Sequence, residues 1–134
     1  MDLVLMLHSI IRWAIVLVAV VGVARYALIL MARASGGRMD RGLMSGYTGL
    51  MDLNALLGII YLMWSGIATA VWFPLQRVEH MVTNLVAVAV AHIFASRGRR
   101  AADDQAMARS NLLGLVLSML LVVIAVAAIG GWSR

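Results

Sequence analysis

Four long apolar runs, separated by three short polar segments, dominate the pattern of the chain. They extend over about residues 3–32, 43–73, 75–96 and 111–132. Each is long enough, at about 20 residues or more, to cross the hydrocarbon core of a bilayer as a helix. A backbone in lipid must satisfy its own hydrogen bonds, so each run is predicted to be helical. Because the connections are short, we expect a single transmembrane domain, an all-α up-down four-helix bundle embedded in the lipid bilayer.

The composition favours the same class of protein. Of the 134 residues, 63% are hydrophobic and only 13% are charged, and the mean hydropathy is +0.96. A soluble domain carries about 25% charged residues, so these proportions indicate an integral membrane protein. The absence of cysteine excludes disulfides, thiolate metal sites and thiol catalysis.

The net charge of +5 is distributed unevenly between the polar segments. The first segment (33–42) and the third (97–109) together hold Arg33, Arg38, Arg41, Arg97, Arg99, Arg100 and Arg109. The second (74–80) holds only Arg77, which Glu79 balances. This grouping is typical of membrane topology rather than of nucleic-acid binding, and it predicts that the first and third segments are cytoplasmic.

Both termini and the 74–80 turn are then expected outside, in the periplasm of a Gram-negative cell. Trp72 and Trp132 would contribute to an aromatic belt on that outer side.

The three histidines lie within the predicted helices, where ionisable residues are costly and usually face the bundle interior. His8 and His80 each lie about five residues into the first and third runs, which point in the same direction. They are therefore expected at similar depth near the outer face. His92 follows His80 by twelve residues, which places it about 18 Å deeper and about 120° around the helix. His80 and His92 thus cannot hold one metal ion between them.

Two neutral imidazoles that face each other across a bundle are the arrangement that a six-coordinate b-type haem needs. Arg12 lies one turn after His8, and Arg77 lies just before His80. Either arginine could pair with a haem propionate. The alternative is that both histidines are simply polar residues near helix ends, within reach of interfacial water.

His92 has a different candidate partner in Asp52, which is expected at similar depth on the second run. A carboxylate beside an imidazole can be a structural hydrogen-bonded pair. It can also be a quinone-binding or proton-uptake site, because histidine exchanges a proton near neutral pH.

The chain resembles a group of small four-span bacterial membrane proteins that are often labelled cytochrome b-like. The similarity rests on "LHSIIRW" (residues 7–13), "LLGIIYL" (56–62) and "VEHM" (78–81), and it extends over most of the chain. It implies electron transfer through haem b in the bacterial inner membrane, with His8 and His80 at the ligand positions. Asp52 departs from relatives that carry a histidine in that region.

The leading hypothesis is therefore a small b-type cytochrome, an electron-transfer protein rather than a stand-alone enzyme. It would exchange electrons with a quinone or a periplasmic carrier. The first alternative is a cofactor-free accessory subunit of a larger energy-transducing membrane complex. The second is a quinone-binding module centred on Asp52 and His92.

Overall fold

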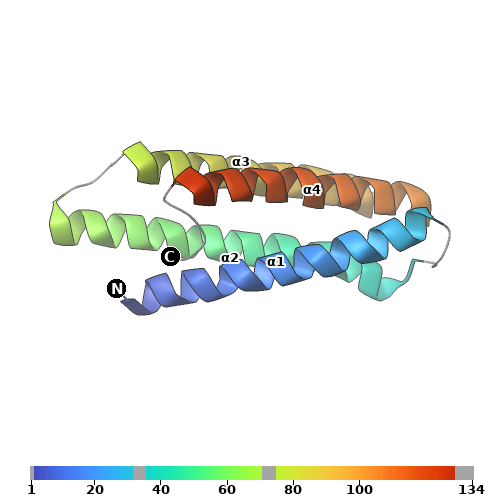
Figure 1. Ribbon diagram of the computed structural model, residues 1–134. Helices are drawn as coiled ribbons and strands as arrows, with labels where there is room; N and C mark the ends of the chain where they lie inside the picture. The colour runs from blue at the N-terminus through green and yellow to red at the C-terminus, as the bar shows by residue number, and fades with distance from the viewer. Residues whose placement is uncertain (1, 32–35, 71–74, 129–134) are drawn as a thin grey trace.

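The computed structural model describes residues 2–31, 36–70 and 75–128. Within them the regular elements are four helices: α1 (Asp2–Leu30), α2 (Arg38–Thr69), α3 (Leu75–Arg99) and α4 (Asp104–Ala128). The helices lie side by side, and successive helices run antiparallel (Figure 1). Helix α1 packs against α2 and α4, and α3 packs against the same two helices. Helices α1 and α3 are therefore diagonal to each other across the bundle.

The two ends of the bundle differ. At one end, here called the amino-terminal end, α1 and α3 begin and α2 and α4 finish. The opposite, arginine-rich end contains residues 25–31, 36–41 and 97–109. The pair α1/α2 and the pair α3/α4 lie close together at the arginine-rich end and diverge toward the amino-terminal end (Figure 1).

Two helices begin earlier than their apolar runs. Helix α2 begins at Arg38 rather than near residue 43, because Asp40 Oδ2 accepts a hydrogen bond from the Gly37 N–H at 3.0 Å and closes the first turn. Helix α4 begins at Asp104 rather than near residue 111. There the Asp103 carboxylate accepts the N–H of Ala106 at 2.8 Å, as an N-cap does. Helix α3 ends at Arg99, three residues past the expected end.

The core depends on small residues that let the helices approach closely. Ala87, Ala91 and Ala95 recur every four residues along α3, and each is at most 2% exposed. On α4, a methyl group added at Gly114 would lie 2.7 Å from Phe94 Cβ. Small residues of this kind are what close helix packing requires.

Polar contacts fasten the arginine-rich end. Arg25 donates to both oxygens of Asp40, at 2.8 and 3.0 Å, and so links α1 to α2. The Tyr26 hydroxyl donates to the backbone carbonyl of Asp40 at 2.5 Å. Gln105 Nε2 donates to the carbonyl oxygen of Ile29 at 2.5 Å and links α4 to the end of α1.

All four helices are long and apolar enough to span a membrane. Their outward faces carry many exposed large apolar side chains, among them Leu17 at 64% exposed and Leu120 at 57% exposed. A soluble surface rarely exposes contiguous apolar area on this scale. The predicted belt residues Trp72 and Trp132, together with Arg33, lie outside the described residues.

Candidate functional site

A cavity opens between the helices toward the amino-terminal end of the bundle. All four helices line it, through Leu5, His8, Ser9, Arg12, Ile15, Met51, Asn54, His80, Asn84, Val88, Val122 and Val126. Six of these twelve side chains are apolar, and the other six bring two imidazoles, one guanidinium, two amides and one hydroxyl to the space. Apolar walls with a few convergent polar groups are typical of small-molecule and cofactor sites.

His8 reaches the cavity from α1 and is fixed against α2. Its Nδ1 lies 3.0 Å from the backbone carbonyl oxygen of Asn54. Gly58 allows this close approach, because a methyl group added there would lie 3.3 Å from His8 Cε1. The imidazole ring of His8 therefore lies close to the α2 backbone at two places, the carbonyl of Asn54 and the position of Gly58.

His80 enters from α3, on the diagonally opposite side. Its Nδ1 lies 2.8 Å from the backbone carbonyl oxygen of Ala125 on α4. The centroids of the two imidazole rings are 6.3 Å apart, and the ring planes are inclined at 73°. The structure therefore brings together the two histidines for which the sequence predicts a common depth.

The two backbone hydrogen bonds determine which ring nitrogen is available. A carbonyl oxygen only accepts, so Nδ1 of each imidazole carries the hydrogen and Nε2 of the neutral ring presents a lone pair. Neither Nε2 atom makes a hydrogen bond within the described part of the chain. An N–H to carbonyl bond behind the ring is the usual support of a metal-ligating histidine, because it fixes both tautomer and orientation.

Among the described residues, no carboxylate or further imidazole joins these two rings. The described residues contain no group of three or more His, Cys, Asp or Glu side chains that could hold a metal ion. Two imidazoles suit a metal whose remaining ligands come from elsewhere, as four nitrogens do from a porphyrin. Two rings bound on opposite sides of one metal, each at about 2 Å, have centroids roughly 6 to 6.5 Å apart, which includes the observed separation.

The charge of the cavity suits an anionic ligand. Arg12 is 7% exposed and brings a guanidinium to the lining, whereas no carboxylate is among the lining residues that the structure describes. The side-chain oxygen of Asn54, which also lines the cavity, is buried and has no hydrogen-bond partner among the described residues. A buried polar atom without a partner is costly, so a donor such as a water molecule or a ligand is expected there.

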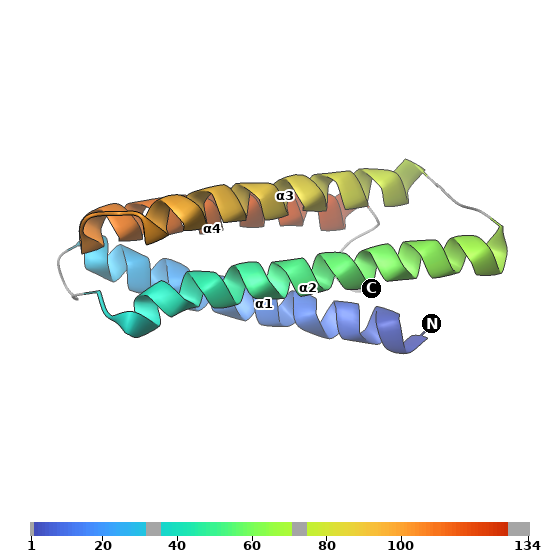
Figure 2. The same ribbon diagram turned by 180° about the vertical axis from the view of Figure 1, so that it is seen from behind.

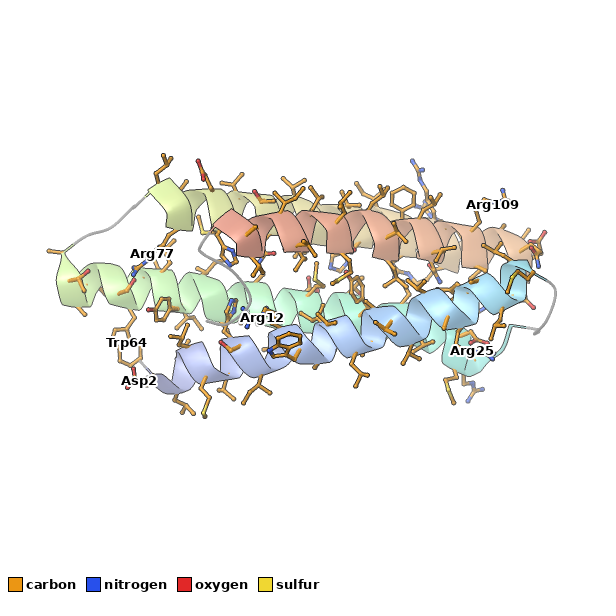
Figure 3. All side chains as sticks on the ribbon, viewed as in Figure 1. Asp2, Arg12, Arg25, Trp64, Arg77 and Arg109 are labelled. Carbon is orange, nitrogen blue, oxygen red and sulfur yellow. The ribbon has the colours of Figure 1, made fainter. Side chains whose placement is uncertain are left out.

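Arg77 lies in the same half of the bundle as Arg12, whereas Arg25 and Arg109 mark the arginine-rich end (Figure 3). The Arg77 guanidinium donates to Ser65 Oγ at 2.7 Å and lies 5.7 Å from the centre of the Tyr61 ring. Arg77 is not among the cavity-lining residues. Its expected role beside a propionate would require it to leave these α2 partners.

The cavity is small in this conformation. Its volume is about 60 Å³, compared with about 150 Å³ for a cavity that binds a single benzene ring. Two imidazoles are the ligand pair that a b-type haem requires, but a macrocycle would enter only if the two helix pairs separated further or the lining side chains repacked. The α1/α2 and α3/α4 pairs already diverge at this end of the bundle (Figure 1).

Asp52 and His92 form the second polar pair. His92 Nε2 lies 2.7 Å from Asp52 Oδ1, and the pair joins α2 to α3. The interior position expected for both groups is wrong, because the His92 and Asp52 side chains are 44% and 50% exposed. This pair lies on the outer surface of the bundle, away from the cavity.

Comparison with family models, with curated proteins and with solved structures finds no match to this chain.

The backbone groups that hold the two histidines cannot be predicted from the spacing of residues along the sequence. The carbonyl groups of Asn54 and Ala125 carry no signal in the sequence, because every residue has a carbonyl. Gly58 and Asn54 do have one: they lie four residues apart on one face of the second run, and a small residue next to a polar one in a membrane helix indicates close contact.

Proposed function

We propose that the chain is a multi-pass membrane protein of the b-type cytochrome class, with one haem held between α1 and α3 by His8 and His80. The observation that supports this most directly is the pair of rings 6.3 Å apart, each tied through Nδ1 to a backbone carbonyl. The Arg12 charge on the cavity wall, and the absence of carboxylates among the described residues of that wall, favour a ligand with acidic groups.

The residues would divide the work as follows. His8 and His80 bind the metal through Nε2, and the Asn54 and Ala125 carbonyls hold the rings in place. Arg12 pairs with a carboxylate of the ligand. Val88 and Val122 line the wall and exclude water. When bound, the haem supplies a one-electron redox couple, so electron transfer is the function.

We further propose that the protein lies in a bacterial inner membrane with its arginine-rich end in the cytoplasm. The 17 residues from His80 to Arg97 correspond to about 26 Å of helix, close to the roughly 30 Å of a hydrocarbon core. The proposed haem would then lie near the outer surface, where a periplasmic carrier or a quinone has access.

An absorption spectrum of the purified protein tests this proposal. The chain is produced in haem-replete cells, purified in mild detergent and reduced with dithionite. We expect sharp α and β bands of low-spin haem b at about one haem per chain. A colourless preparation that also binds no added haemin would contradict the proposal and leave a cofactor-free accessory role.

Variants test the ligand assignment. His8→Gly and His80→Gly should each remove the low-spin bands, and added imidazole should restore them by occupying the vacated space. Restoration distinguishes a lost ligand from a failure to fold. The matched control is His92→Gly, which should keep the full spectrum. Loss of the bands in the control, or unchanged bands in both test variants, would overturn the assignment.

A further inference from the structure

Helices α2 and α3 face the viewer in Figure 2. The surface that they share carries the exposed Asp52–His92 pair. His92 lies five residues before Arg97 on α3, which places the pair about 7 Å from that arginine toward the apolar part of the helix. In a membrane this position is inside the hydrocarbon region. Ionisable side chains at such depth normally face protein or a water-filled space, because exposure to lipid is costly.

The pair also has unused hydrogen-bonding capacity. Its single hydrogen bond uses His92 Nε2 and Asp52 Oδ1. Asp52 Oδ2 and His92 Nδ1 make no hydrogen bond within the described residues. When His92 is protonated, its Nδ1 is a donor and Asp52 Oδ2 is an acceptor. The surface thus presents one acceptor and one donor at the same depth. Two copies of this surface could therefore pair, with the donor of each copy facing the acceptor of the other.

The α2 side of this surface follows a helix-packing pattern. Seven positions spaced alternately by three and four residues are exposed along it: Gly42, Ser45, Gly49, Asp52, Leu56, Ile59 and Met63. Methyl groups added at Gly42 or Gly49 would meet nothing within 4 Å. The alternating spacing is that of helices packed as in coiled coils, and small residues at it allow another helix to approach closely.

We propose that a second copy of this chain packs on the α2/α3 surface, related by a two-fold axis parallel to the helices. The axis direction follows from the membrane, since both copies must have the same orientation in it. Such an axis keeps every residue at its own depth. Asp52 of each copy then meets His92 of the other, and the four groups form a closed network shielded from lipid.

Crosslinking of single-cysteine chains in lipid vesicles tests the proposal, because the chain has no cysteine of its own. Ser45→Cys adds a thiol to the proposed interface with almost no change in size. Val20→Cys is the control at the same depth: Arg25 of α1 bonds Asp40 of α2, and residues 20 and 45 each lie five positions from that pair. Val20 is 62% exposed on α1. Under mild oxidant, Ser45→Cys should form dimers at least tenfold faster than Val20→Cys.

Exchange of the two charged groups tests whether the pair carries the contact. Asp52→His places two imidazoles on the face and should reduce the dimer fraction severalfold. Asp52→His combined with His92→Asp restores the self-complementary arrangement and should restore the dimer. If Asp52→His does not fold, the lipid-compatible double variant Asp52→Leu/His92→Leu replaces it and should be monomeric.

Equal crosslinking of the two cysteine variants would overturn the proposal. So would an unrestored dimer in the exchanged variant, a monomer that binds quinone through Asp52, or a stable complex of one copy with a different protein. The haem spectrum is independent of all these outcomes, because the His8–His80 site is formed within one chain.

Discussion

At the scale of single residues, Gly58 determines how closely His8 can approach α2. A methyl group at this position would be 3.3 Å from His8 Cε1, and a branched side chain would push the ring further. We expect Gly58→Val to shift the imidazole and to weaken binding of the proposed haem about tenfold, the scale on which residues that support a metal ligand act. Titration of the apoprotein with haemin, followed by the α band, measures this change.

The control for this prediction is Gly46→Val on the same helix. A methyl group added there would meet nothing within 4 Å, so the variant carries the same cost in helix propensity without touching His8. Equal haem affinity in the two variants would show that His8 does not depend on the gap at Gly58.

Residue counting predicts how deep the histidines lie but not which way they face. The common depth of His8 and His80 follows from two helices that run in the same direction. Counting also places Asp52 level with His92. It cannot give the rotation of a helix about its own axis, since 100° per residue fixes only relative angles. The expectation of an interior Asp52–His92 pair therefore failed, whereas its contact distance of 2.7 Å agrees with the predicted depth.

At the scale of the helix, the Arg25–Asp40 contact joins α1 to the first turn of α2. The Asp40 side chain is 5% exposed and accepts two hydrogen bonds from the guanidinium. Asp40→Ala should lower the free energy of unfolding by about 2 kcal/mol, typical of a hydrogen-bonded charged group. Denaturation in mixed micelles of increasing SDS content, followed by circular dichroism, measures the change.

Arg41→Ala provides the comparison at the same end of the bundle. Arg41 lies 3.8 Å from Asp104, and both side chains are 44% exposed. Solvent screens such a pair, so its loss should cost under about 1 kcal/mol. A larger effect for Arg41→Ala than for Asp40→Ala would contradict the role given to the buried carboxylate.

Capping carboxylates explain why two helices begin earlier than their apolar runs. Hydropathy ends a run where polar residues begin, yet a capped polar turn continues a helix. Asp40 at the start of α2 and Asp103 before α4 supply those caps. The number, order and direction of the helices follow from the apolar runs and short connections alone.

At the scale of the whole molecule, the distribution of arginines predicts the orientation in the membrane. With both ends of the chain outside, alkaline phosphatase fused to either terminus should be active, and green fluorescent protein inserted at residues 100–103 should fluoresce.

His8 and His80 would then lie near the outer surface. Dithionite crosses membranes slowly, so it should reduce the proposed haem rapidly in right-side-out vesicles and slowly in inverted ones. Faster reduction in inverted vesicles, together with inactive phosphatase at both termini, would contradict this orientation. It would place the arginine-rich end outside and the proposed haem near the cytoplasmic side.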